Sequence, residues 1–477
     1  MLSSLPICAA FQSKNNGKYL RYNVPDGEEA NNQLLQLSGE DAVNPYTRFF
    51  IEPSAKHDGL VHIRCCYNNK YWVAQQGLPY QWWIAGSADE PEEDQTQESC
   101  TLFELKPVEG DSNNIRFSHA RLGKYSGMFP YSNQANEVFQ ACLCVGDKEQ
   151  WEQFTMVHLS PWVLPKHVCF KGDNGRYLSS QLHNGHQFLL FTSEDIGDPS
   201  VRHSTMATND GTMLIKSDHF GQFWRRSDSI DQFSWIIANS SSNNNPDTLF
   251  KSVPFDDGKI GLVNMGNSQY CKRLIIVQIR NGLSATGHRD EPFSRLSFEE
   301  PVLSREINNI QFRPNQAKIY GQNELILDTA SVTNNTSSVM SSASLTMEFT
   351  VEETRRWASS MTLRSPVRSA ITSRTLTTVD GRSAVETGEF RGLYSWGATN
   401  VKRTKESVVL QVDVPPMTKV TVTCRARESS YDVPFSYRQV DKMIDGAEVS
   451  LPFDDGIYSG RNAHSIVYDF KEEKINQ

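Results

Sequence analysis

Short runs of β-branched and aromatic residues alternate with Asn, Gly, Asp, Ser and Pro along most of the 477-residue chain. Apolar residues at helical spacing are scarce. Alternation of this kind is typical of half-buried strands separated by turns, because successive side chains of a strand point to opposite faces. The sequence therefore predicts an all-β protein.

A turn followed by an aromatic residue recurs in the first 300 residues and divides them into units. The aromatic residues of the six occurrences are Tyr19, Tyr71, Tyr125, Tyr177, Phe223 and Tyr270. Such turns recur by chance in any β protein, but six occurrences about fifty residues apart favour a true repeat. Three units, twice over, predict two tandem β-trefoil domains, residues 1–159 and 163–303.

The composition changes near Ser304, where long runs of alternating Ser, Thr and Val residues begin. Residues 326–333, 344–351, 407–414 and 419–424 all follow this pattern. They are longer than the strands expected in the barrels. We therefore expect residues 304–477 to form an elongated antiparallel β-sheet domain.

The stretch from Trp357 to Phe390 has its charges and its apolar residues at alternate positions. The apolar set is Met361, Leu363, Val367, Ile371, Val379 and Val385, and the arginines are Arg364, Arg368 and Arg374. Each arm exceeds the about 9–11 residues that a tilted strand needs to cross a bilayer. The pattern allows a membrane-insertion hairpin with a lipid-facing apolar side and an arginine-lined lumen. A sheet on a protein surface alternates in the same way.

Charge and cysteine content exclude several classes of protein. The chain has 47 Lys and Arg against 56 Asp and Glu, and this acidic balance argues against nucleic acid as a partner. No apolar run is long enough for a membrane helix. The first twenty residues lack the features of a signal peptide, so we expect a soluble protein made in the cytoplasm that associates with membranes conditionally. The nine cysteines show no metal-binding spacing, so we expect neither a metal nor a cofactor.

Residues 77–87 are the most promising glycan-binding stretch, because they combine aromatic rings with amide side chains. Indoles stack on the apolar faces of sugar rings, and amides hold their hydroxyl groups. The candidate residues are Tyr80, Gln81, Trp82 and Trp83. Adjacent residues of a strand point to opposite faces, so we expect one tryptophan in the core and the other exposed. A purely structural role for both fits the spacing equally well.

The sequence shows no nucleophile and base in an arrangement typical of an enzyme. The acidic runs Glu92-Glu93-Asp94 and Asp256-Asp257 occur in turn-like sequence and are interpreted as solvated loop charge. His183 and His186 have no third metal ligand nearby. We expect this protein not to be an enzyme. A glycoside hydrolase with lectin modules would need a carboxylate pair in a cleft.

Residues 1–300 resemble the amaranthin-type agglutinins, lectins built of two tandem β-trefoils. The similarity is carried by residues 11–22, 58–63 and 83–91 in the first half, and by residues 170–178, 211–217 and 223–226 in the second. It implies binding of a glycan of the galactosyl-N-acetylgalactosamine type. Residues 80–83 match the family's Asn-His-Tyr-Trp site run, but only the terminal tryptophan, Trp83, is kept.

Residues 305–477 resemble the aerolysin-type β-pore-forming module. Residues 344–357, 388–396, 414–422 and 433–437 carry this similarity. It implies homo-oligomerisation at a membrane and insertion of the hairpin between Trp357 and Phe390. The expected function is a lectin that targets glycosylated membranes and assembles into a transmembrane β-barrel pore in defence. The alternative is a soluble glycan-binding defence or stress lectin whose long sheet serves only self-association.

Overall fold

The computed structural model describes residues 8–23, 33–76, 82–109, 111–131, 140–146, 152–159, 162–227, 230, 233–241, 245–365 and 367–475. Within these residues the regular structure consists of β-strands and short 3-10 turns, so the predicted all-β class is confirmed. Each 3-10 turn begins with a proline, whose fixed φ suits the first position of a helical turn. The turns are η3 (Pro45–Thr47), η5 (Pro199–Val201), η6 (Pro246–Thr248), η7 (Pro292–Ser294) and η8 (Pro314–Gln316).

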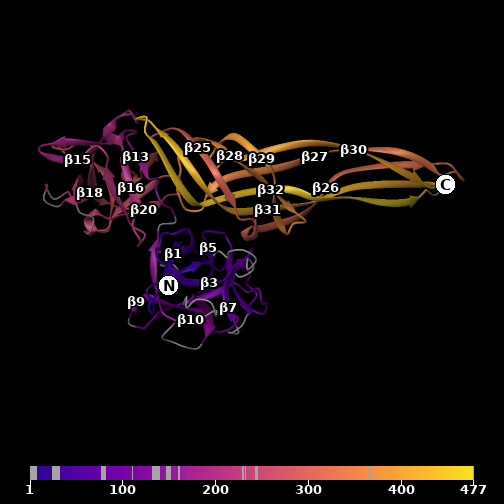
Figure 1. Cartoon of the computed structure of the whole chain (residues 1–477), viewed down its shortest axis with the longest axis horizontal. Coiled ribbons are helices and arrows are strands. Elements are labelled where there is room, and N and C mark those ends of the chain that lie inside the picture. Colours follow the sequence, from indigo (N-terminus) through magenta and orange to yellow (C-terminus); the bar gives the residue numbers. More distant parts are fainter. Residues whose placement is uncertain are drawn as a thin grey trace. The chain divides into compact units, whose positions relative to one another are not determined.

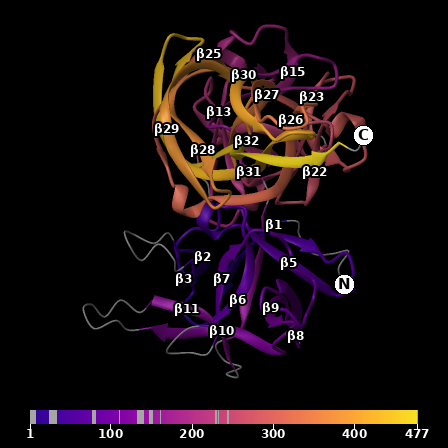
Figure 2. The ribbon, with the colours of Figure 1, turned by 90° about the vertical axis from the view of Figure 1, so that its right-hand side faces the viewer.

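The first twelve strands form a closed barrel with three capping hairpins. They are β1 (Cys8–Ser13), β2 (Tyr19–Tyr22), β3 (Leu35–Gly39), β4 (Phe49–Pro53), β5 (Leu60–Cys65), β6 (Tyr71–Gln76), β7 (Trp82–Ala88), β8 (Leu102–Val108), β9 (Asp111–His119), β10 (Lys124–Tyr131), β11 (Gln140–Gly146) and β12 (Phe154–Leu159). Pairings join β1, β12, β9, β8, β5 and β4 into a ring of six strands. The hairpins β2–β3, β6–β7 and β10–β11 contact one another through β3, β7 and β11 (Figure 2). This is the arrangement expected of a β-trefoil.

The next twelve strands repeat the pattern. They are β13 (His167–Lys171), β14 (Tyr177–His183), β15 (His186–Ser193), β16 (His203–Ala207), β17 (Met213–Ser217), β18 (Gln222–Ser227), β19 (Trp235–Ser240), β20 (Phe250–Pro254), β21 (Ile260–Asn264), β22 (Gln269–Leu274), β23 (Gly282–Gly287) and β24 (Ser297–Glu299). Strands β13, β16, β17, β20, β21 and β24 close the ring, the last step being a bridge between Ile260 and Leu296. In both barrels every repeated aromatic residue is the first or second residue of a capping hairpin.

The last eight strands form one antiparallel sheet of much longer strands. They are β25 (Val302–Phe312), β26 (Lys318–Asn334), β27 (Ser341–Ser359), β28 (Arg368–Val379), β29 (Ser383–Ser395), β30 (Thr399–Val414), β31 (Thr418–Met443) and β32 (Glu448–Lys474). Their order is β29-β28-β25-β31-β32-β27-β30, and β26 pairs with β31. Strands β26, β27, β30, β31 and β32 lie side by side in the part of the sheet that extends to the C-terminus of the chain (Figure 1).

Two compact units are defined by contacts within the chain. The first contains residues 1–306, 359–368 and 439–451, and the second contains residues 307–358, 369–438 and 452–477. The three sheets lie within the predicted ranges 1–159, 163–303 and 304–477, apart from Val302 and Leu303 at the start of β25. The compact units do not follow the predicted boundary at 304, because two segments beyond it pack with the first unit.

Candidate glycan site and candidate insertion hairpin

The predicted glycan-binding stretch lies on hairpin β6–β7. Tyr80 and Gln81 lie outside the described residues. Trp82 and Trp83 begin β7, and their exposed fractions are only 8% and 3%. The expectation that one of them would be exposed is wrong. Five consecutive residues from Trp82 are buried, so both faces of β7 are covered, and pairing with β6 and β11 covers both of its edges.

Trp82 nevertheless contacts a cation. The Arg121 guanidinium lies 5.3 Å from the centre of its ring, within the range of a cation–π interaction. Trp83 lies opposite Cys144 of β11. Neither indole offers a free face for stacking on a sugar in this conformation, so a role in binding requires the adjoining hairpin to move. The assignment of Tyr80, Gln81, Trp82 and Trp83 to a sugar site stays a prediction.

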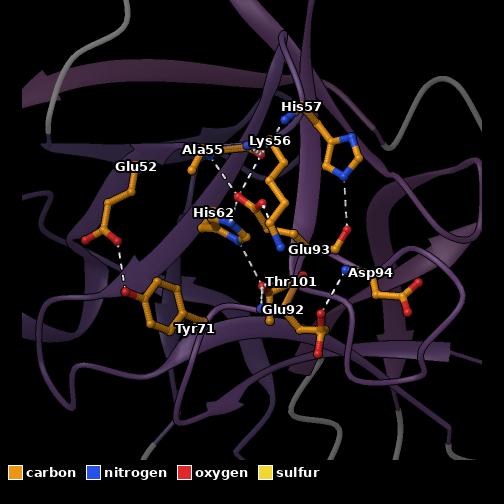
Figure 3. A network of polar contacts seen from close by, with 11 residues as sticks. Glu52, Ala55, Lys56, His57, His62, Tyr71, Glu92, Glu93, Asp94 and Thr101 are labelled. Atoms are coloured by element: carbon orange, nitrogen blue, oxygen red, sulfur yellow. Dashed lines mark hydrogen bonds and ion pairs between the residues drawn. The ribbon is translucent and has the colours of Figure 1, made fainter.

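The loop after β7 is fastened by one carboxylate (Figure 3). Glu93 Oε1 accepts hydrogen bonds from Ser54 Oγ and the Ala55 backbone N–H, both at 2.8 Å. Its other oxygen lies 3.9 Å from Lys56 Nζ. Partial burial acts to raise the pKa of Glu93, but the hydrogen bonds from Ser54, Ala55 and His62 outweigh it and hold the pKa at about 2. Glu93 is therefore an ionised acceptor that fixes the loop, and it is poorly suited to donate a proton.

The segment predicted to insert contains a true hairpin, β28–β29, preceded by residues 360–367, which we call the anchor segment. The hairpin turn is formed by Asp380 and Gly381, whose φ angles are 52° and 64°. Positive φ at both central residues defines a type I′ turn, for which Asp-Gly is a preferred sequence. The Arg382 N–H donates to the Val379 carbonyl at 3.1 Å and closes it.

The predicted apolar set does not share one face in this structure. Met361, Leu363 and Val367 lie in the anchor segment and are half-buried. Ile371 is buried, whereas Val379 and Val385 are 41% and 43% exposed. The reason is a change of phase along β28: the buried positions are odd at Ser369 and Ile371 but even at Leu376 and Thr378. One continuous alternation over both arms was therefore wrong for this conformation.

The three arginines predicted for the lumen lie in different environments. Arg364 belongs to the anchor segment, and its side chain is 5% exposed and 3.9 Å from the Glu300 carboxylate. Arg368 is exposed at the start of β28. Arg374 is 69% exposed and pairs with Glu386 of β29 at 2.9 Å. Their role in a pore stays a prediction, and Arg364 has to leave Glu300 to take it up.

The anchor segment is bound at two places within the first unit. The Val163 N–H donates to the Met361 carbonyl at 2.9 Å, and the Leu363 N–H donates to the Val163 carbonyl at 2.8 Å. Glu300 Oε2 accepts from the Ser365 N–H at 2.9 Å and from Ser365 Oγ at 3.1 Å. The anchor segment is thus fixed by backbone pairing and by a buried carboxylate.

Buried charges hold that carboxylate in turn. Arg305 is buried and donates to both oxygens of Glu300 and of Asp441. Burial acts to lower the pKa of Arg305, but hydrogen bonds and charge pairing with Asp441 and Glu300 raise it well above its usual value. Arg305 therefore stays charged. Glu300 and Arg305 are five residues apart, but Asp441 comes from a distant segment, and no spacing in the sequence signals the three together.

The hairpin tip is held by side chains of the sheet beneath it. Asn462 Oδ1 of β32 accepts from the Thr378 N–H at 3.0 Å and from Thr378 Oγ1 at 2.8 Å. Gln322 Nε2 of β26 donates to the Gly381 carbonyl at 2.8 Å. Tyr431 Oη of β31 donates to the Leu376 carbonyl at 2.8 Å. We call these contacts the tip clasp. A lone Asn, Gln or Tyr in a long strand gave no sequence signal.

No metal-binding cluster is found among the described residues. Nor does the described part of the chain contain a helix long and apolar enough to cross a membrane.

Comparison with known proteins assigns the first part of the chain. The profile of the agglutinin domain matches twice, over residues 3–148 and 162–280, which together exceed half of the sequence. The chain therefore belongs to the agglutinin domain family, and its resemblance to amaranthin-type agglutinins is confirmed. No curated protein matches the sequence.

Several solved structures are similar to parts of the chain. Lamprey immune protein matches with 12% identity over 66% of this chain and 90% of its own length, with a TM-score of 0.29. An aerolysin-like protein from Bombina maxima matches with 11% identity over 35% of this chain and 99% of its own, with a TM-score of 0.25. Parasporin-2 of Bacillus thuringiensis, a toxin described as recognising cancer cells, matches with 16% identity over 35% of this chain and 72% of its own, with a TM-score of 0.21.

Proposed function

We propose that this protein is a lectin that binds a glycan of the Gal/GalNAc type on a membrane and then assembles with other copies into a β-barrel pore. The two agglutinin domain matches support the lectin part. The topology around hairpin β28–β29 supports the pore, because the hairpin is an excursion from a ladder that is complete without it.

That ladder joins β27 directly to β30. Sixteen residue pairs run without interruption from Ser341 opposite Val414 to Arg356 opposite Thr399. The chain between the last pair leaves the ladder, forms β28 and β29, and returns. Once released from β25, β28 would continue β27 and β29 would continue β30. The same two-stranded ladder would become longer, and β27 and β30 would keep their present pairing. An isolated strand edge cannot persist in lipid, so such hairpins must close with those of neighbouring copies.

The hairpin strands have the length and the polarity for this role. β28 has 12 residues and β29 has 13, against about 9–11 needed to cross a bilayer. Their exposed residues include Arg368, Arg374 and Glu386, which suit a water-filled lumen.

The test is dye release from liposomes that carry or lack a glycolipid ending in a Gal/GalNAc disaccharide. Release only from glycolipid liposomes, together with ring-shaped oligomers after detergent extraction, is the expected result. Binding to these liposomes without release would overturn the pore and leave the soluble lectin as the function. Release that ignores the glycolipid would overturn the lectin-targeted part.

A further inference from the structure

Polar contacts hold hairpin β28–β29 at its two ends, and Ile371, Leu376 and Ala384 of the hairpin are buried in the core of the sheet. The anchor segment is fixed by Val163 and Glu300, and the tip is fixed by the tip clasp. Between them, the hairpin borders an open groove of about 460 Å³ towards β25, lined by residues that include Phe312, Arg374 and Phe390. Release of the hairpin therefore either breaks the polar contacts at both ends or pivots about one of them.

The two arms of the excursion differ in length. The β27–β30 ladder ends where Arg356 pairs with Thr399. The outgoing arm from Trp357 to Val379 has 23 residues, whereas the return arm from Arg382 to Ala398 has 17. One continuous antiparallel hairpin with the present turn therefore leaves six residues of the outgoing arm without partners.

The surplus residues coincide with the anchor segment. The described residues between β27 and β28, 360–365 and 367, lie outside any strand, and the matching gap on the return side, residues 396–398, is only three residues long. The strands that remain are long enough to cross a bilayer without the anchor segment. The anchor segment is therefore not needed in the membrane.

The contacts at the two ends also differ in kind. The anchor segment donates two hydrogen bonds from Ser365 to the buried Glu300 carboxylate and places Arg364 3.9 Å from it, and hydrogen bonds to an ionised group are stronger than those between uncharged groups. The tip clasp consists of hydrogen bonds between uncharged groups, each of which contributes only modestly to stability. By its polar contacts, the tip is the weaker of the two ends, and the packing of the buried Leu376 is the other contact that opening has to overcome there.

Resting on the proposed function, we infer that hairpin β28–β29 opens from its tip while the anchor segment stays docked as a hinge. The tip clasp is then the autoinhibitory contact that keeps the protein in its soluble form. Arg364 stays beside Glu300, and only Arg368 and Arg374 enter the lumen.

Two engineered disulfides test the direction of opening. Thr378→Cys with Asn462→Cys locks the tip, and Val163→Cys with Thr362→Cys locks the anchor segment at a pair of bridge partners. Each disulfide is verified by thiol titration, and dye release is measured before and after reduction. We expect the oxidised tip lock to lose at least ten-fold in release rate and to recover on reduction. The oxidised anchor lock is expected to release dye at the wild-type rate.

Release by the oxidised tip lock, or its loss in the oxidised anchor lock, would overturn the inference. If the wild type releases no dye, the proposed function fails, and hydrogen exchange in solution then tests the inference separately. Gln322→Ala, which removes the clasp contact to the Gly381 carbonyl and keeps the acceptor of the Thr378 amide, is expected to speed exchange of the Thr378 amide at least ten-fold and to leave the Leu363 amide unchanged. Asn323→Ala, at an exposed position of β26, is the matched control. Equal acceleration at both amides would show that the two ends open together and overturn the inference.

Discussion

Leu376 is the residue whose truncation should loosen the hairpin most cleanly. It lies on β28 with no exposed surface, in a cluster with Trp357, Ile371 and Tyr431. Replacing a buried leucine with alanine costs about 2–5 kcal/mol, because the cavity closes only in part. The cost falls on the docked hairpin and is absent once the hairpin has left. Since 1.4 kcal/mol is a factor of ten, the open population should rise roughly thirty-fold to several thousand-fold.

Native-state hydrogen exchange measures this change directly, because amide protection reports the free energy of local opening. Amides of β28 should lose protection by that factor in Leu376→Ala, while amides in the middle of β31 report global stability. Leu393→Ala is the matched control, because Leu393 lies on β29 of the same hairpin and is 60% exposed. Its effect should stay within about 0.5 kcal/mol. Equal exchange in the two variants would refute the idea that packing under β28 holds the hairpin.

Two further predictions concern buried charge. Burial lowers the pKa of His119 and His203 to about 4, so the unfolded chain takes up protons first as the pH falls. The free energy of unfolding should be highest above about pH 6.5 and should decline by up to about 3 kcal/mol per histidine as the pH falls to 4. Urea unfolding at a series of pH values measures this decline. If the double variant His119→Gln/His203→Gln shows the same decline, the histidines are not its cause. Arg305→Met should cost about 3–5 kcal/mol in urea unfolding, because Glu300 and Asp441 lose their shared cation. Lys18→Met, in the exposed pair with Glu40, should cost less than about 1 kcal/mol, and similar costs for both variants would rule out a special role of the buried cluster.

The local pattern of the sequence was sufficient to find the strands and the repeat. Tyr71 and Tyr177 begin β6 and β14, because a turn followed by an aromatic residue is a local signal. Burial of Trp82 and Trp83 was not predictable in the same way. Alternation assumes that one face of a strand is open, whereas both faces of β7 are covered and its neighbours include β11, more than fifty residues away in the sequence.

The hairpin predicted to insert shows the same limit more sharply. Side chains alternate between the two faces of a strand. The even positions Arg364, Arg368 and Arg374 therefore share a face only if one strand continues through all three. The strand begins at Arg368, because the backbone of Met361 and Leu363 bonds to Val163 instead of a neighbouring strand. Which arginines can share a face is therefore decided by where the six surplus residues of the outgoing arm are accommodated. That property depends on the register of the β27–β30 ladder, which alternation within one segment does not encode.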